Sequence, residues 1–191
     1  TLSFELSLFG KRVFVNSGIS QYNVGTERDW QRSTAAHNTV EINGENSSDV
    51  WGGFRVGRRA YPFDISINNA VDGVVDISGG HDGYQRLKGQ PIHQRNWSFR
   101  DNEMVVTDSI QGSFDSAKAY FYLHPDIKIT QKNMNQYVLS VLGRTVHLEF
   151  IGVLLCEIKE TFWYPSFGQS ISNLCLVGHF QKNKIITKVN W

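Results

Sequence analysis

Residues 32–42 read Arg-Ser-Thr-Ala-Ala-His-Asn-Thr-Val-Glu-Ile, a stretch in which a short helical turn is expected to give way to a β-strand. Val40 and Ile42 flank Glu41 in the alternation of a half-buried strand, which Gly44 ends. A lone histidine, His37, occupies the junction. Polar side chains at such junctions are held by neighbouring backbone yet stay open to a ligand, so this stretch predicts a candidate functional residue beside a strand.

Strand signals continue on both sides of this stretch. Upstream, residues 2–8 alternate apolar and polar side chains, and Gly10-Lys11 turns the chain into a hairpin partner at 12–15. Residues 26–31 are the best helical candidate, with Thr26 as the expected N-cap and Asp29 three residues on. Downstream, strands are expected at 63–67, 74–77, 97–99, 104–108, 118–123, 127–130, 137–142, 146–150, 154–158, 173–180 and 184–189.

The chain has 191 residues, within reach of a single all-β domain, which can extend to roughly 200–250 residues. Aromatic residues, which favour strands, make up 13% of the sequence, and turn signals recur every ~8–12 residues. We therefore predict an all-β fold: one large antiparallel β-sandwich (a super-sandwich) over residues 1–191, with one short helix.

Charge and cysteine content exclude several function classes. Lys and Arg number 19 against 18 Asp and Glu, a balance that argues against a nucleic-acid-binding footprint but leaves room for a local basic groove. No apolar run approaches the ~20 residues of a membrane span. The two cysteines, Cys156 and Cys175, lie in apolar strand-like segments, so we expect buried free thiols.

Two groups of residues can carry acid–base chemistry. His37 can act as a base or a metal ligand, although an ordinary hydrogen-bonding role is the simpler interpretation without further context. Asn38 beside it can satisfy turn backbone. The loop at 81–86 contains His81, Tyr84 and Arg86, a trio able to supply an acid, a base and a carboxylate partner, although any loop might contain it.

Arginines form the third candidate group. They cluster near the aromatic residues of segment 51–61, a combination that suits a polyanionic sugar, because guanidinium pairs with carboxylate or sulfate while aromatic rings cover sugar faces. Surface arginine is otherwise most often solvated or paired. The candidate substrate-binding residues are Arg32, Asn38, Trp51, Arg55, Arg58 and Arg86.

Taken together, these segments resemble the C-terminal part of heparinase II/III-like proteins, a family of polysaccharide lyases. The similarity spans about residues 2–168, and residues 32–60 are its most specific part. The matching segments are 2–6, 13–18, Tyr22, Arg28, 32–40, 43–48, Trp51, 54–60, His81-x-Gly83-Tyr84 and 163–168.

The resemblance implies a β-sandwich that shares a substrate cleft with an N-terminal α/α toroid, which this chain lacks. Such lyases cleave uronic-acid-containing polysaccharides by β-elimination, and their catalytic tyrosine belongs to the toroid. We therefore expect an acidic polysaccharide as substrate, a periplasmic or secreted location, and no activity from the isolated chain. His37, His81 and Tyr84 are the candidate catalytic residues on the sandwich side.

Some relatives are also expected to hold a structural metal, zinc or calcium, with the histidine of the His-Asn-Thr-Val segment as one ligand. Here the tentative ligands are His37 and Asn16, and Asn16 stands where the family has an aspartate. A neutral amide is a poor zinc ligand, so we predict no tight zinc site and no cofactor in this chain.

Two alternative interpretations remain open. A non-catalytic carbohydrate-binding or scaffolding sandwich would present an exposed aromatic platform with arginines and no histidine facing a cleft. A cupin-like metal enzyme is less favoured, because His37 has no second histidine at short spacing.

Overall fold

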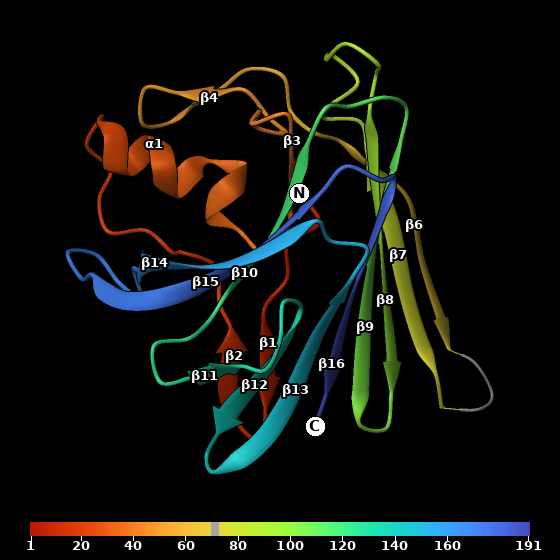
Figure 1. The fold of residues 1–191 in the computed structure, drawn as a ribbon. Helices are drawn as coiled ribbons and strands as arrows, with labels where there is room; N and C mark the ends of the chain where they lie inside the picture. Colours follow the sequence, from red (N-terminus) through yellow and green to blue (C-terminus); the bar gives the residue numbers. More distant parts are fainter. Residues whose placement is uncertain (70–72) are drawn as a thin grey trace.

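Residues 1–69 and 73–191 are described by a computed structural model, in which strands dominate (Figure 1). The helical segments are α1 (Thr26–Arg32) and the short 3₁₀ helix η1 (Thr34–Ala36). The strands are β1 (Leu6–Leu8), β2 (Lys11–Phe14), β3 (Val40–Ile42), β4 (Val50–Trp51), β5 (Arg55–Val56), β6 (Pro62–Asn69), β7 (Val75–His81), β8 (Ile92–Arg100), β9 (Glu103–Gln111), β10 (Ala117–Tyr122), β11 (Lys128–Gln131), β12 (Gln136–Val141), β13 (Arg144–Ile151), β14 (Leu155–Trp163), β15 (Ile171–Phe180) and β16 (Lys184–Asn190).

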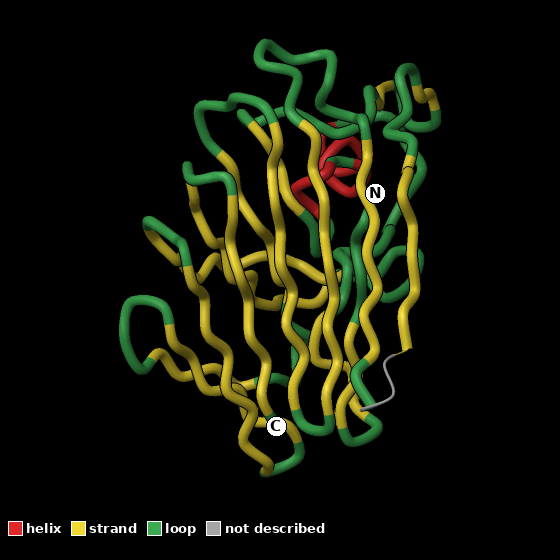
Figure 2. The backbone as a smooth tube through the Cα atoms, turned by 90° about the vertical axis from the view of Figure 1, so that its right-hand side faces the viewer, coloured by secondary structure: helices red, strands yellow, loops and turns green. Residues whose placement is uncertain are grey.

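Two antiparallel sheets face each other, which confirms the predicted sandwich. The larger has eight strands in the order β11-β12-β13-β16-β9-β8-β7-β6, and Figure 2 shows its strands side by side. The smaller has four strands in the order β14-β15-β10-β3. The pairs β1-β2 and β4-β5 form two short hairpins. Short turns join consecutive strands such as β8-β9 and β12-β13, whereas β9-β16, β13-β16, β10-β15 and β3-β10 are neighbours in space that lie far apart in the sequence.

The core lies between the two sheets and follows the alternation of the sequence. In β10, Ala119 and Phe121 point to the main core. Tyr120 and Tyr122 point to the other face of the same strand and pack in a second cluster with Ala35 of η1. The helical segment 26–36 therefore covers the outer face of the small sheet, which leaves β10 buried on both faces.

Two local predictions at the N-terminal end were wrong. Thr26 does not cap α1: Gly25 occupies the N-cap position, and no side chain caps the helix. The alternation at residues 2–8 yields strand pairing only at Leu6–Leu8. Residues 2–5 lie outside the β-ladder, although Phe4 packs against the rings of Phe14 and Phe121, because apolar burial also holds a segment without ladder hydrogen bonds.

Both cysteines are buried free thiols, as predicted. Burial raises the pKa of Cys156 to about 11, and it also raises the pKa of Cys175. Neither thiol is therefore a reactive thiolate at neutral pH.

Candidate functional site

His37 directly follows η1, and its ring faces a surface hollow. The chain turns there from the 3₁₀ helix into β3, and the ring Nδ1–H donates a hydrogen bond of 2.8 Å to the Ser33 carbonyl oxygen. Burial lowers the pKa of His37, and the hydrogen bond to Ser33 opposes this only in part. The imidazole is therefore neutral at pH 7, and its Nε2 is an acceptor that no other described residue engages.

The hollow has a volume of about 380 Å³ and is predominantly polar. Residues with a hydroxyl side chain make up most of the lining, and they come from three segments: 1–3, 33–39 and 47–48. Its lining residues are Thr1, Ser3, Arg32, Ser33, Thr34, His37, Thr39, Ser47, Ser48, Val50, Val56, Arg59 and Ala60. The Ser33 hydroxyl is buried and has no hydrogen-bond partner among the described residues. A wall of hydroxyls beside two guanidinium groups fits a hydroxylated, negatively charged ligand.

Arg32 and Arg59 supply the positive charge of the hollow. Arg32 lies at the end of α1 and donates to the carbonyl oxygens of Trp51 (3.0 Å) and Arg55 (2.8 Å), so it also anchors the β4-β5 hairpin. Trp51, Arg55 and Arg58 are exposed, but they do not line the hollow. Their role in substrate binding stays a prediction.

Asn38, the neighbour of His37, is fully buried. Its Nδ2 donates to the carbonyl oxygens of Phe4 (2.8 Å) and Val15 (3.1 Å), and its Oδ1 accepts the Tyr122 N–H at 2.7 Å. These bonds join the N-terminal segment, the residue that follows β2, and β10 at one point. Asn38 therefore holds the loop in place, and its burial corrects the expectation that it contacts substrate.

A buried ion pair supports the same loop from the large sheet. Arg95 on β8 binds Asp108 on β9 through two contacts, Nε to Oδ1 at 2.7 Å and Nη2 to Oδ2 at 2.9 Å. Its Nη1 donates to the carbonyl oxygens of Asn38 (2.6 Å) and Leu2 (2.8 Å). Both side chains are fully buried. Arg95 thus fastens the backbone beside His37 to the central strands of the large sheet.

Two histidines extend this network. His93 Nε2–H donates to Asp108 Oδ1 at 2.6 Å, which leaves Nδ1 to accept from His81 Nε2 at 3.2 Å. The remaining His81 Nδ1 accepts the Gly83 N–H at 3.2 Å. Every ring nitrogen has a partner when both imidazoles are neutral. Burial lowers the pKa of His81 to about 2 and also lowers that of His93, while Arg95 helps to hold the pKa of Asp108 at about 2.

The structure places His81 and Tyr84 inside the protein, behind the wall of the hollow and not in its lining. Both are almost completely buried, and the Tyr84 hydroxyl donates to the Val40 carbonyl oxygen at 2.7 Å. Burial raises the pKa of Tyr84 well above its ordinary value. Direct action on a substrate requires contact with it, and neither ring offers that contact, so we correct their predicted catalytic role to a structural one.

Arg86 is likewise engaged within the protein. Its guanidinium donates to the carbonyl oxygens of Gly83 and Asn46, and it forms ion pairs with Asp49 at 3.3 Å and Glu45 at 3.7 Å. A Cβ at Gly83 would overlap the Ser47 carbonyl oxygen and the Ala60 side chain, which explains the glycine in this loop. The loop at 81–86 therefore supports the wall that carries Ser47 and Ala60, and Arg86 does not line the hollow.

The tentative metal ligands do not fit a zinc or calcium site in this domain. Asn16 Oδ1 already accepts the Asn38 N–H at 3.0 Å, and His37 offers a single free nitrogen. Among residues 1–69 and 73–191, no three side chains of His, Cys, Asp or Glu gather in a metal-binding arrangement. One imidazole and one occupied amide are too few donors for a tight site.

The sequence analysis did not predict the buried network, since it assigned no contact or function to His93, Arg95 and Asp108. A signal was nevertheless present. His93 and Arg95 are two residues apart on one strand, at positions that face the core. Polar residues at core-facing positions of a strand are uncommon and indicate a buried partner on a neighbouring strand.

Comparison with known proteins identifies the family. The model of the family described as heparinase II/III-like, C-terminal, matches residues 1–191. The chain belongs to the heparinase II/III-like family. No curated protein matches this heparinase II/III-like chain.

Solved structures share the fold of this heparinase II/III-like chain. The heparan sulfate lyase HepC from Pedobacter heparinus is 16% identical, with a TM-score of 0.76 over 98% of this chain. A protein described as a heparinase III gene product is 17% identical, with a TM-score of 0.75 over the same share. The chain spans only 30% of the HepC chain and 29% of the heparinase III chain.

Proposed function

We propose that this chain is the C-terminal β-sandwich domain of a longer lyase, which cleaves an acidic, uronic-acid-containing polysaccharide by β-elimination. The observation that carries the proposal is His37, a neutral imidazole with a free Nε2 in a hydroxyl-lined hollow that also contains Arg32 and Arg59. Family membership and the heparinase names of the solved relatives support it.

β-Elimination needs a group that neutralises the uronate carboxylate, a base for the adjacent C–H, and an acid for the leaving oxygen. Arg32 and Arg59 supply positive charge for the carboxylate, and the hydroxyls of the hollow hydrogen-bond to the sugar. His37 Nε2 accepts a hydrogen bond or a proton from the bound sugar. The remaining catalytic groups belong to a preceding α/α toroid that closes the cleft.

We further propose a periplasmic or secreted location, in line with polysaccharide breakdown. Across the residues that the structure describes, no helix is long and apolar enough to cross a membrane. We expect the longer protein to carry a secretion signal. Fractionation of cells that express it should then recover it from the periplasm or the medium.

The test compares the longer protein with its His37→Ala and Arg59→Gln variants on heparin, heparan sulfate, chondroitin sulfate and alginate. Unsaturated product is followed by its ultraviolet absorbance. We expect His37→Ala to lower kcat/KM about 100-fold, because acid–base groups contribute about 10²–10⁴-fold. Lys182→Gln, an exposed change on the β15–β16 turn, serves as the control. Wild-type rates in His37→Ala would contradict the proposed role.

One observation favours the non-catalytic alternative. Tyr22, Phe54 and Phe167 form an exposed aromatic cluster, with Tyr22 lying 5.5 Å from Phe54 and 5.1 Å from Phe167 between ring centroids. The Arg28 guanidinium lies 5.2 Å from the Tyr22 ring centroid. Glycan binding by the chain that is lost in Trp51→Ala or Phe54→Ala, but retained in His37→Ala, would support a carbohydrate-binding module instead.

A further inference from the structure

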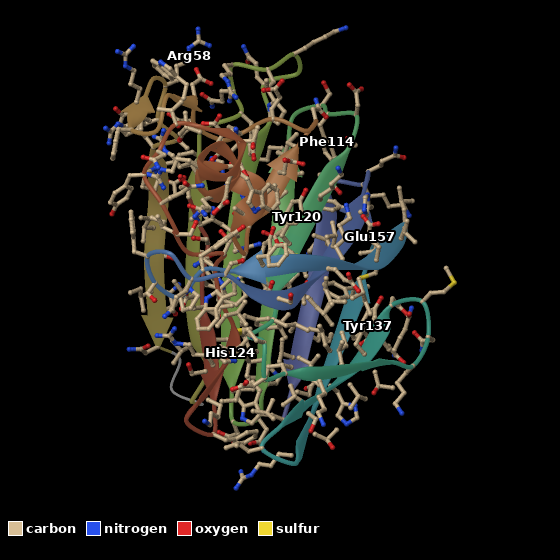
Figure 3. The ribbon with its side chains drawn as sticks, turned by 90° about the vertical axis from the view of Figure 1, so that its left-hand side faces the viewer. Arg58, Phe114, Tyr120, His124, Tyr137 and Glu157 are labelled. Carbon is tan, nitrogen blue, oxygen red and sulfur yellow. The ribbon has the colours of Figure 1, made fainter. Side chains whose placement is uncertain are left out.

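A second hollow lies at the opposite end of the sandwich. It has a volume of about 390 Å³ and forms where the β1-β2 hairpin, the β10–β11 connection and the β12–β13 turn meet. In Figure 3, His124 from its wall lies low on the molecule, while Arg58 of the loop beside the His37 hollow lies at the top. The two hollows share no lining residue.

Positive charge dominates this second hollow. Lys11, Arg12 and Lys128 contribute to its lining, all three are exposed, and none forms an ion pair within the described residues. Asp126 is the single carboxylate of the lining, and its Oδ2 lies 3.6 Å from His124 Nδ1. Three cations against one carboxylate leave a net positive potential around this concavity, which attracts an anion.

The wall of the hollow holds part of this charge in place. The Arg12 guanidinium lies 6.0 Å from the Trp163 ring centroid, and the His124 ring packs against Trp163 at 4.7 Å. Arg144, which directly follows the lining residue Gly143, lies over Phe9 at 4.4 Å. Contact with an aromatic face orients a guanidinium while its N–H groups stay available to a ligand.

We propose that this hollow binds sulfate or carboxylate groups of an acidic glycan chain, at a site separate from the His37 hollow. The inference rests on the proposed function for the choice of glycan. A polymeric substrate extends beyond a hollow of about 380 Å³ and passes over more of the protein surface. Arginine and lysine at a second point of contact add affinity by pairing with its anionic groups and releasing counterions.

The test uses the 191-residue chain and a size-defined heparin oligosaccharide, with binding measured by calorimetry at low and at physiological salt. The triple variant Lys11→Gln/Arg12→Gln/Lys128→Gln is compared with Lys132→Gln/Lys182→Gln/Lys184→Gln, which removes the same charge from exposed lysines elsewhere. We expect at least a tenfold loss of affinity in the first variant and less than a threefold change in the second. An equal loss in both would overturn the proposal.

A second measurement needs no variant. In nuclear magnetic resonance spectra of the unmodified chain, the probe should shift the Arg12 Nε–H and Trp163 indole signals. Unchanged signals there would count against the site. Single-stranded DNA of equal charge should bind at least tenfold more weakly, and equal binding would also overturn the assignment to a glycan. Because neither experiment uses turnover, their outcome is separate from the lyase test on His37.

Discussion

At the scale of single residues, adjacent side chains of one motif have opposite roles. His37 presents a free ring nitrogen to a polar hollow, whereas Asn38 is buried and uses its amide to join three segments. The alternation of the backbone at the start of a strand sends successive side chains to opposite sides. Function and stability can therefore be separated at this motif by substituting one residue at a time.

We predict that Asn38→Ala lowers the free energy of unfolding by about 3 kcal/mol or more, because it leaves two carbonyl oxygens and one N–H buried without partners. His37→Ala, which removes one hydrogen bond at a half-buried position, should cost about 1 kcal/mol. Urea denaturation of both variants checks the prediction. Equal losses in the two variants would show that Asn38 does not hold the loop.

At the scale of elements, strands β7, β8 and β9 carry a polar network through the core. The charges of Arg95 and Asp108 neutralise each other in a bidentate pair. His93 then donates to Asp108 and bonds to His81, with both imidazoles neutral. A buried pair adds little net stability relative to apolar side chains, but removal of one partner leaves an uncompensated charge. The network is therefore best tested by single and double substitutions.

Asp108→Asn is predicted to destabilise the domain by about 3–5 kcal/mol, since Arg95 then lies buried without its counter-charge. The double variant Arg95→Met/Asp108→Leu should recover at least half of that loss. Chemical denaturation of the single and double variants measures both values. A double variant less stable than Asp108→Asn would indicate that the bonds from Arg95 to the Asn38 loop dominate.

The same network predicts loss of stability in acid. The folded-state pKa of His81 is lowered to about 2 from an ordinary value of 6.5, so its contribution to stability is complete above pH 6.5 and is lost as pH falls below it. Between pH 6.5 and 5, proton binding by His81 in the unfolded state lowers the free energy of unfolding by about 2 kcal/mol. Asp108, with its pKa lowered to about 2 from 3.8, adds a further loss below pH 3.8.

Urea denaturation from pH 8 to 4.5 tests this pH dependence, with His81→Asn as the comparison. The variant should show a smaller slope of stability against pH between 6.5 and 5, whatever its stability at pH 8. An unchanged slope would mean that His81 does not titrate with unfolding.

At the scale of the whole molecule, one sandwich carries two separate hollows. The His37 hollow lies beside the helical segment that covers the small sheet, and the basic hollow lies at the other end, beside the β1-β2 hairpin. The chain spans about 30% of the HepC chain. Under the proposed function, catalysis depends on groups that a preceding domain brings to the first hollow.

The isolated chain should therefore show no lyase activity on heparin, heparan sulfate, chondroitin sulfate or alginate. Absorbance of the unsaturated product checks this, with the longer protein as the positive control. Clear turnover by the isolated chain would place the whole catalytic apparatus within the sandwich.

Zinc should bind weakly to this chain, since Asn16 is already bonded to Asn38 and His37 has one free nitrogen. Zinc affinity is measured by titration with a competing zinc indicator. The unmodified chain should bind zinc no more tightly than the His37→Ala variant does. Asn16→Asp, which introduces a carboxylate beside His37 and should raise the affinity for zinc, is the informative comparison. Tight binding by the unmodified chain that is lost in His37→Ala would contradict the prediction.

The sequence alone determined the family, the all-β class and the approximate position of every strand except β4 and β5. Period-two alternation is a local property, so it is visible at segments such as 118–123 and 184–189 without knowledge of their partners. The position of His37 was also visible, because the change from a helical turn to strand alternation within residues 32–42 is a local pattern too.

Only the tertiary structure decided which polar residues face solvent. His81, Tyr84 and Asn38 resemble site residues in the sequence, yet they are buried, because loop 81–86 packs under Ser47 and Ala60 and three segments converge on Asn38. The partners of Arg95 lie 13, 57 and 93 positions away. Contacts between such distant residues form only when the sheets pack together, so no local pattern in the sequence specifies them.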